Sequence, residues 1–149
     1  MLVCAKFQAV ERKRRDKDMA ISNIKAVFQS NLQTVWDTVT SLENYQWRSD
    51  LSRIEVVSEN QFIEYTKDGY ATTFTITASV PFERWEFDME NSNMVGHWTG
   101  IFKGKGGKTE IDFTEDVTAK KLIMKPFVKG YLKKQQDQYV SDLRKALKK

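Results

Sequence analysis

The side chains that most often carry catalysis or bind metals are scarce in this sequence. His97 is the only histidine and Cys4 is the only cysteine. A disulfide within the chain and a thiolate cluster around zinc are therefore excluded, and nucleophilic sites of the Ser/His/Asp or Cys/His kind are disfavoured. Strand alternation places His97 on the side opposite Trp98, so we expect it on the outer surface. The sequence accordingly predicts neither a metal nor a cofactor.

Glu64 is the carboxylate with the clearest potential role, in the segment Phe-Ile-Glu-Tyr-Thr. If Phe62 points into the core, Glu64 points the same way, because it stands two residues further along a strand. A buried carboxylate is costly unless it is paired, so its burial would indicate a purpose. Acid/base catalysis by Glu64 with Tyr65 or Tyr131 stays open, and so does a position at a strand edge that faces water.

Two arginines follow Trp47 and could meet an anionic group of a ligand. These are Arg48 and Arg53. Structural pairing of Arg48 with Asp50 or Glu43 explains its position equally well, so both alternatives stay open.

The glycine-rich run Gly-Lys-Gly-Gly-Lys-Thr resembles a phosphate-binding loop only in composition. In that motif the first glycine would have to stand where Phe102 is, and a helix would have to follow where the pattern predicts a strand. We interpret residues 104–108 as a hairpin turn.

Length and composition are typical of one soluble domain. The chain has 149 residues, of which 40% are hydrophobic and 30% are charged. No apolar stretch approaches the roughly 18 to 20 residues that a membrane span needs, and residues 1–18 lack the apolar core of a secretory signal. We expect a cytoplasmic protein in which residues 1–18 are a flexible extension and residues 19–149 form the domain. The sequence leaves the oligomeric state open.

Charge is distributed unevenly along the chain. Formal balances are +3 for residues 1–18, −7 for residues 19–119 and +8 for residues 120–149. An acidic body and a basic C-terminal segment attract each other within one molecule. Binding to nucleic acid is disfavoured, because the basic residues lie on the solvent face of an amphipathic helix and no nucleic-acid-binding motif accompanies them.

The N-terminal part predicts a strand followed by one or two short helices. A strand is expected near residues 21–28, and Ser30 or Asn31 can cap a helix that carries Val35, Trp36 and Val39 at helical spacing. Ser41 is a second possible cap, so residues 41–47 are predicted to form a second short helix or a turn.

From Leu51 the apolar period changes to two, which predicts six consecutive antiparallel strands. They are expected near residues 52–58, 61–67, 70–79, 82–90, 94–103 and 109–118. Asp68-Gly69 is a strong hairpin signal between two of them. The alternation assigns an apolar face that contains Trp85, Phe87, Met89, Ile111, Phe113 and Val117, and an opposite face that is charged.

After Thr118 the pattern returns to a helical period and predicts a long C-terminal helix. Its apolar stripe is expected to contain Phe127, Tyr131, Tyr139, Leu143 and Leu147, flanked by Val128, Leu132 and Val140. This helix would supply the second half of the core.

The order of these elements resembles the helix-grip fold of the START and birch-pollen-allergen superfamily, in particular its polyketide cyclase and dehydrase-like branch, also called SRPBCC proteins. The likeness covers residues 19–149. It is carried by NLQTVWDTVTSLENYQWRSD, FIEYTKDG, the strand pair RWEFDMEN and GHWTGIF, FTEDV, and the terminal KPFVKGYLKKQQDQYVSDLRKAL. The fold class implied is α+β, with one strand, two short helices and a six-strand meander that wraps the long terminal helix.

The resemblance implies a cavity between the concave face of the sheet and the long helix, with Trp47 near one end. Its candidate ligand-binding residues are Trp47, Phe62, Glu64, Phe74, Trp85, Phe87, Trp98, Phe102, Phe113, Phe127 and Tyr131. Each aromatic residue taken alone is also an ordinary core residue. Gly96 and Gly100 flank Trp98, where the lack of side chains would let the sheet bend or leave space beside the indole.

Three functions compete at this point. The leading hypothesis is a binder of a small hydrophobic or amphipathic molecule. The alternatives are an enzyme of the polyketide cyclase, aromatase or dehydratase kind and a protein-interaction module that uses the basic helix or the outer face of the sheet. Fold alone does not decide among them.

Overall fold

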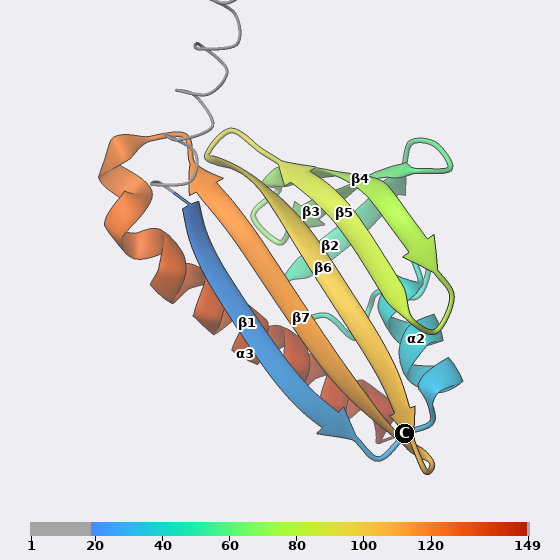
Figure 1. Ribbon diagram of the computed structural model, residues 1–149. Coiled ribbons are helices and arrows are strands. Elements are labelled where there is room, and N and C mark those ends of the chain that lie inside the picture. The colour runs from blue at the N-terminus through green and yellow to red at the C-terminus, as the bar shows by residue number, and fades with distance from the viewer. Residues whose placement is uncertain (1–18, 149) are drawn as a thin grey trace, which may run out of the picture.

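The protein, seen in a computed structural model that describes residues 19–148, is a curved antiparallel sheet with two helices packed against it (Figure 1). The prediction for residues 1–18 falls outside the described residues. Within residues 19–148 the sheet has seven strands in the order β1-β7-β6-β5-β4-β3-β2. The elements are β1 (Met19–Phe28), α2 (Leu32–Thr40), β2 (Leu51–Val56), β3 (Gln61–Thr66), β4 (Ala71–Val80), β5 (Arg84–Glu90), β6 (Met94–Lys105), β7 (Lys108–Ala119), the short 3₁₀ helix η1 (Leu122–Met124) and α3 (Lys125–Leu147).

The predicted six-strand meander is confirmed as β2 to β7, and β1 joins the sheet beside its last strand, β7. Strands β2 to β7 pair with their neighbours in sequence, and β1 pairs with β7 from Met19 to Phe28. The glycine-rich run forms the turn between β6 and β7, where Gly106 and Gly107 adopt positive φ angles of 52° and 85° that suit glycine. The predicted hairpin turn is therefore correct.

Residues 41–50 form turns, so α2 is the one helix between β1 and β2, where the resemblance implied two and the residue pattern allowed a helix or a turn. The Ser41 hydroxyl accepts a hydrogen bond from the backbone N–H of Asn44 at 3.0 Å, and the N–H of Arg48 donates to the carbonyl of Tyr45 at 3.0 Å. Ser41 thus caps a turn, which was the second alternative for this segment. The segment connects α2 to β2, and we call it the α2-β2 loop.

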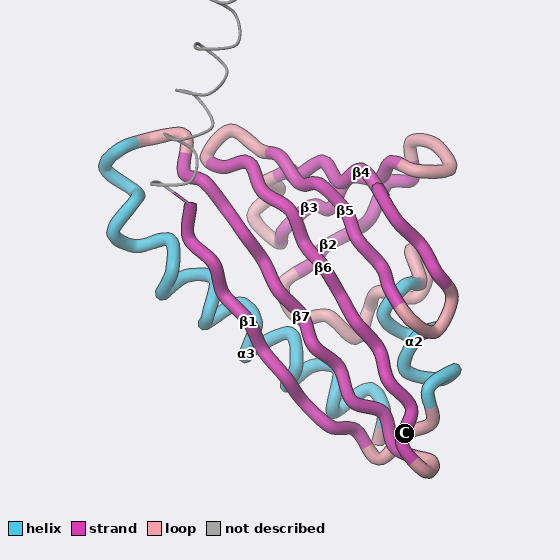
Figure 2. The backbone as a smooth tube through the Cα atoms, viewed as in Figure 1, coloured by secondary structure: helices cyan, strands magenta, loops and turns pink. Residues whose placement is uncertain are grey.

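Both helices pack on the concave face of the sheet, as the tube in Figure 2 helps to follow. In β5 the apolar residues Trp85, Phe87 and Met89 are buried while the charged ones alternate outward, as predicted. Trp36 of α2 meets Phe102 of β6 edge to face, with ring centroids 4.9 Å apart. The strand period of two therefore sets which side chains can meet the helices.

The buried face of α3 is rotated relative to the predicted stripe. Val128, Leu132, Val140 and Leu143 are buried, whereas Phe127 is 71% exposed. The first turns of α3 project past the edge of the sheet (Figure 1), so an aromatic residue there has no sheet to pack on. The flanking positions Val128, Leu132 and Val140 therefore form the core face together with Leu143 of the predicted stripe, and only the N-terminal part of that stripe is exposed.

A buried polar pair fixes α3 against β1. The Ser22 hydroxyl donates to Oε1 of Gln136 at 2.7 Å, and Nε2 of Gln136 donates to the Ser22 carbonyl at 3.0 Å. Both residues are buried. Because unpaired amide groups are costly in such a place, this reciprocal pair selects one register of the helix on the strand.

Gly100 makes room for the indole of Trp98. A Cβ atom at Gly100 would collide with Cη2 and Cζ3 of Trp98, whereas a Cβ at Gly104 would make ordinary contacts of 3.5 Å with Leu32. The space that Gly100 leaves by having no side chain is thus occupied by the indole of Trp98.

Gly100→Ala should destabilise the fold by about 1 to 3 kcal/mol, because the new methyl group forces Trp98 out of its packed position. Gly104→Ala, on the same strand, is the matched control and should change stability by less than about 0.5 kcal/mol. Urea denaturation measures both. Equal stabilities of the two variants would show that Trp98 can move aside freely.

Candidate functional site

A cavity of about 390 Å³ lies in the core, between the concave face of the sheet, α3 and the α2-β2 loop. This volume is within the range of small-molecule pockets. The sheet contributes most of the apolar wall, and the loop and α3 contribute aromatic and polar groups. The three structural units that enclose it come from distant parts of the chain.

The apolar wall is a continuous cluster of aromatic rings. Phe62 stacks on Phe74 with ring centroids 5.0 Å apart, and Phe87 stacks on Trp98 at 4.8 Å. Trp85 joins the two pairs by an edge-to-face contact with Phe87 at 5.2 Å. These rings meet because alternate residues of neighbouring strands share the concave face.

Nine of the eleven residues predicted from the sequence line this cavity. They are Trp47, Phe62, Glu64, Phe74, Trp85, Phe87, Trp98, Phe113 and Tyr131. Their contact with a ligand stays a prediction.

Phe102 and Phe127 do not line the cavity. Phe102 is 3% exposed and packs between Trp36 and Phe113, so α2 covers it and it is a core residue. Phe127 lies in the first turn of α3, beside the exposed Leu122 and Ile123 of η1. The strand pattern could not place Phe102, because it does not reveal which part of the concave face α2 covers. The helical pattern could not place Phe127, because it does not reveal where α3 leaves the sheet.

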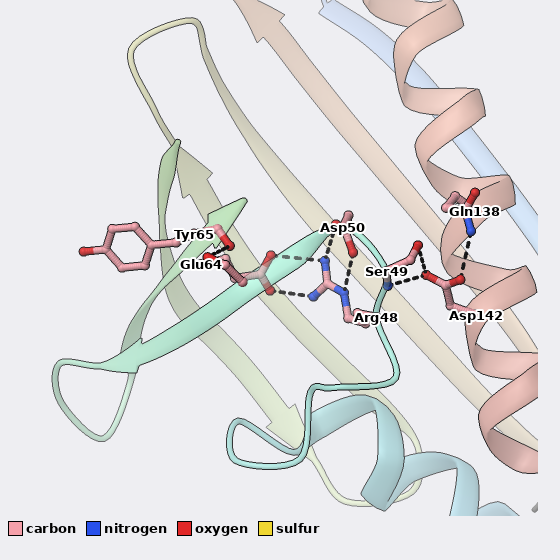
Figure 3. A network of polar contacts seen from close by, with 8 residues as sticks. Arg48, Ser49, Asp50, Glu64, Tyr65, Gln138 and Asp142 are labelled. Atoms are coloured by element: carbon pink, nitrogen blue, oxygen red, sulfur yellow. Dashed lines mark hydrogen bonds and ion pairs between the residues drawn. The ribbon is translucent and has the colours of Figure 1, made fainter. Parts of the chain in front are cut away.

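Arg48 holds the α2-β2 loop against β3 (Figure 3). Its Nη1 and Nη2 donate to the two carboxylate oxygens of Glu64 at 2.7 and 3.2 Å, and its Nε and Nη2 donate to Asp50 at 3.3 and 3.0 Å. Burial alone would lower the pKa of Arg48, but Glu64 and Asp50 outweigh it and raise that pKa. The guanidinium is therefore charged, and four of its five N–H donors are occupied within the protein.

The next residue attaches the same loop to α3 (Figure 3). The backbone N–H and the hydroxyl of Ser49 donate to Oδ2 of Asp142 at 2.8 and 2.7 Å, and Gln138 donates to the other oxygen at 2.8 Å. Burial opposes the charged form of Asp142, but the hydrogen bonds from Ser49 lower its pKa on balance. We call Arg48, Ser49, Asp50, Glu64 and Asp142 together the loop clamp.

The loop clamp decides two questions that the sequence left open, namely whether Glu64 is free for acid/base catalysis and whether Arg48 pairs within the protein. Glu64 shares the concave face with Phe62, as predicted, but both its oxygens accept from Arg48, so it is not a free acid or base. Tyr65 faces the other way, where its hydroxyl donates to Glu55 at 2.9 Å. Arg48 pairs with Asp50, one of the two structural partners predicted for it.

Glu115 is a buried carboxylate of the cavity that was not predicted from the sequence. It lies on β7 opposite Ser22 and Trp98, and it lines the cavity. Burial raises its pKa from the usual 4.5 to about 7, with Arg48 working against that rise and Glu64 adding to it. Its position between Phe113 and Val117 on the inward face was the available signal, since alternation gives Glu115 the same direction.

Tyr139 faces Glu115 and Arg48 from α3, and it was predicted only as part of the apolar stripe. The guanidinium carbon of Arg48 lies 5.2 Å from the ring centroid of Tyr139, and Trp47 meets the ring edge to face at 5.3 Å. Burial raises the pKa of its hydroxyl, so Tyr139 is neutral and can donate or accept a hydrogen bond in the cavity.

His97 lies on the outer face, as predicted. Its ring nitrogens are 2.6 Å from Asp88 and 2.8 Å from Glu86. Burial alone would lower its pKa, but these two carboxylates raise it. Among residues 19–148 no group of histidine, cysteine and acidic side chains could hold a metal ion, and no helix is long and apolar enough to cross a membrane.

The sequence matches the family described as polyketide cyclase/dehydrase and lipid transport over residues 15–148. The chain belongs to this family. No protein of curated function matches the sequence. Several solved structures share the fold of this chain, and because their sequence identities to it are low, they bear on the fold alone.

Three of these structures illustrate the likeness. A START superfamily protein from Mycobacterium smegmatis has a TM-score of 0.77 at 12% identity, covering 86% of this chain and 97% of its own. A conserved protein from Geobacillus kaustophilus has a TM-score of 0.74 at 11% identity, with coverages of 85% and 94%. An uncharacterised protein from Rhizobium leguminosarum has a TM-score of 0.69 at 16% identity, with coverages of 87% and 95%.

Arg48→Met should destabilise the protein by about 3 kcal/mol, because it leaves two partly buried carboxylates without their cation. Arg53→Met is the matched control: Arg53 is exposed, 3.7 Å from Glu55 and 3.8 Å from the ring centroid of Tyr65, so its loss should cost about 1 kcal/mol or less. In a double-mutant cycle, Glu64→Gln should cost less in the Arg48→Met background than in the wild type. Additive costs in urea denaturation would contradict a coupled clamp.

Glu115 should make stability fall as the pH rises. A carboxyl whose pKa is raised by folding binds more protons in the folded state between its two pKa values, here 4.5 and about 7, so charging it opposes folding. Glu115→Gln should match the wild type near pH 4 and exceed its stability near pH 8 by up to about 3 kcal/mol. Urea midpoints across this range measure the difference, and a difference independent of pH would contradict the burial of the carboxylate.

Proposed function

We propose that this protein binds a small hydrophobic or amphipathic molecule in the cavity between the sheet and α3. The observation that carries the proposal is an aromatic-walled cavity of about 390 Å³ in a core that is otherwise closely packed. Protein interiors leave few voids larger than a water molecule, and an apolar void forfeits packing contacts. Burying an apolar ligand there would recover about 25 cal/mol for each Å² removed from water.

The loop clamp supports the same proposal. It anchors the α2-β2 loop to β3 through Glu64 and to α3 through Asp142, so the loop forms a wall whose position is set before any ligand arrives. A preformed site loses less conformational entropy on binding than a flexible one. The family description, which includes lipid transport, is consistent with this use of the cavity.

Filling the cavity with a side chain should abolish binding of Nile red, a neutral apolar dye whose emission rises in apolar surroundings. Ile54 of β2 lines the cavity, whereas Val56 on the same strand is 56% exposed and lies outside it. Wild type and Val56→Trp should enhance the dye's emission saturably, and Ile54→Trp should weaken binding by at least about tenfold. Circular dichroism confirms that both variants fold.

No saturable enhancement by the wild type would overturn the proposal. Equal binding by Ile54→Trp and Val56→Trp would place the dye elsewhere and would also count against it.

An enzyme of the cyclase or dehydratase kind is the second candidate, and Glu115 is the observation that favours it. A carboxyl whose pKa is about 7 is suited to general acid/base catalysis near neutral pH. A dehydratase would release a product lighter than its substrate by one water, so mass spectrometry of the molecules extracted from the purified protein separates the two candidates. A single molecule that is returned unchanged after incubation supports binding alone.

A further inference from the structure

The polar groups of the cavity differ in whether the protein itself satisfies them. Glu64 and Asp50 accept from four of the five N–H donors of Arg48, while Gln138 donates to Asp142 and Gln136 donates to the Ser22 carbonyl. These groups stabilise the wall and have little capacity left for a ligand. A ligand's polar end must therefore find its partner elsewhere in the cavity.

Glu115 is the buried carboxylate of the cavity that the described residues leave without a partner. Its carboxylate lines the cavity from the middle of the concave face, between Ser22 and Trp98 in the neighbouring strands. Ser22 is occupied by Gln136, and among residues 19–148 no hydrogen bond or ion pair engages the Glu115 carboxylate. A carboxylate surrounded by aromatic rings and without a partner is costly, and a ligand that donates a hydrogen bond would remove that cost.

We propose that Glu115 is the polar anchor of the cavity, the group that binds the polar end of the ligand. The cavity then binds an aromatic amphipathic molecule with a hydrogen-bond donor at its buried end. It binds an amine more tightly than an alcohol and excludes carboxylates. This inference rests on the proposed function and adds the chemical class of the ligand.

The charges around Glu115 decide this order of preference. The cationic Arg48 is already outnumbered by Glu64 and Asp50, and Lys134 of α3 is exposed, so water screens its charge. An added carboxylate would meet Glu115 without an unpaired buried cation to neutralise it, and like charges in such a site repel strongly. An ammonium group gains an ion pair with Glu115 and the faces of the surrounding aromatic rings.

An alcohol occupies the intermediate position. It can donate to Glu115 and accept from the hydroxyl of Tyr139, which also faces the cavity and stays neutral. It gains no charge attraction, so its binding depends on hydrogen bonds and apolar burial alone.

Binding of the amine should depend on pH in a defined direction. The groups that face Glu115 are Arg48, Asp50 and Glu64 from the loop and β3, and Tyr131, Lys134 and Tyr139 from α3. Burial raises the pKa of Glu115 to about 7, so this carboxyl changes charge within the range in which a simple aliphatic amine stays protonated. The affinity for the amine should therefore rise from about pH 6 to about pH 8 as Glu115 becomes charged.

Three probes that share one ring system test the proposal by calorimetry: naphthylethylamine, naphthylethanol and naphthylacetate. The wild type should bind the amine at least about tenfold more tightly than the carboxylate, with the alcohol between them. Glu115→Gln should lose the preference for the amine. Asp116→Asn, next to Glu115 but on the outer face with His97, is the matched control and should keep it.

The outcomes separate this inference from the function on which it rests. Equal affinities for the three probes, or an amine preference that survives in Glu115→Gln, would overturn the anchor and leave ligand binding intact. Failure of all three probes while Nile red still binds would also overturn the anchor alone. Failure of the probes and of Nile red would overturn both.

Discussion

The ion pair between Arg48 and Glu64 is the contact on which the shape of the cavity depends. It joins a loop without regular secondary structure to β3, the strand next to the edge strand β2, and Ser49 extends the connection to α3 through Asp142. Partly buried ion pairs add little net stability compared with apolar packing, but they penalise every arrangement that separates the charges. The clamp therefore sets the position of the loop more than it strengthens the fold, and the cavity exists because the loop is held there.

The rest of the concave face is closely packed near β1 and Trp98 and encloses the cavity elsewhere. Reciprocal hydrogen bonds between Ser22 and Gln136 fix α3 on β1, and Gly100 lets the Trp98 indole lie flat among its neighbours. Beyond these contacts a hollow remains, and the rings of Phe62 and Phe87 form part of its wall. Glu115 is the one inward carboxylate there whose oxygens the described residues leave without a partner.

The sequence predicted what depends on local period and little of what depends on contacts between distant segments. Alternation in β5 and β7 placed Trp85 and Phe113 correctly, because the strand period determines direction whatever the partner. The exposure of Phe127 depends on where α3 leaves the sheet, and the pairing of Arg48 with Glu64 depends on how a loop folds back across β3. Neither the exposure of Phe127 nor the pairing of Arg48 with Glu64 can be predicted from the spacing of apolar residues along the chain. Glu115 could have been found, since the same alternation that placed Phe113 gives it an inward direction.

Native mass spectrometry of the protein purified from the organism that makes it tests the central claim, that the cavity is a ligand site, most directly. The account predicts an additional mass on the wild type and on Val56→Trp that is absent from Ile54→Trp, and it predicts that the released molecule is apolar with a neutral or basic polar group. A wild-type protein that carries no bound molecule in any preparation, or one retained equally by Ile54→Trp, would contradict it.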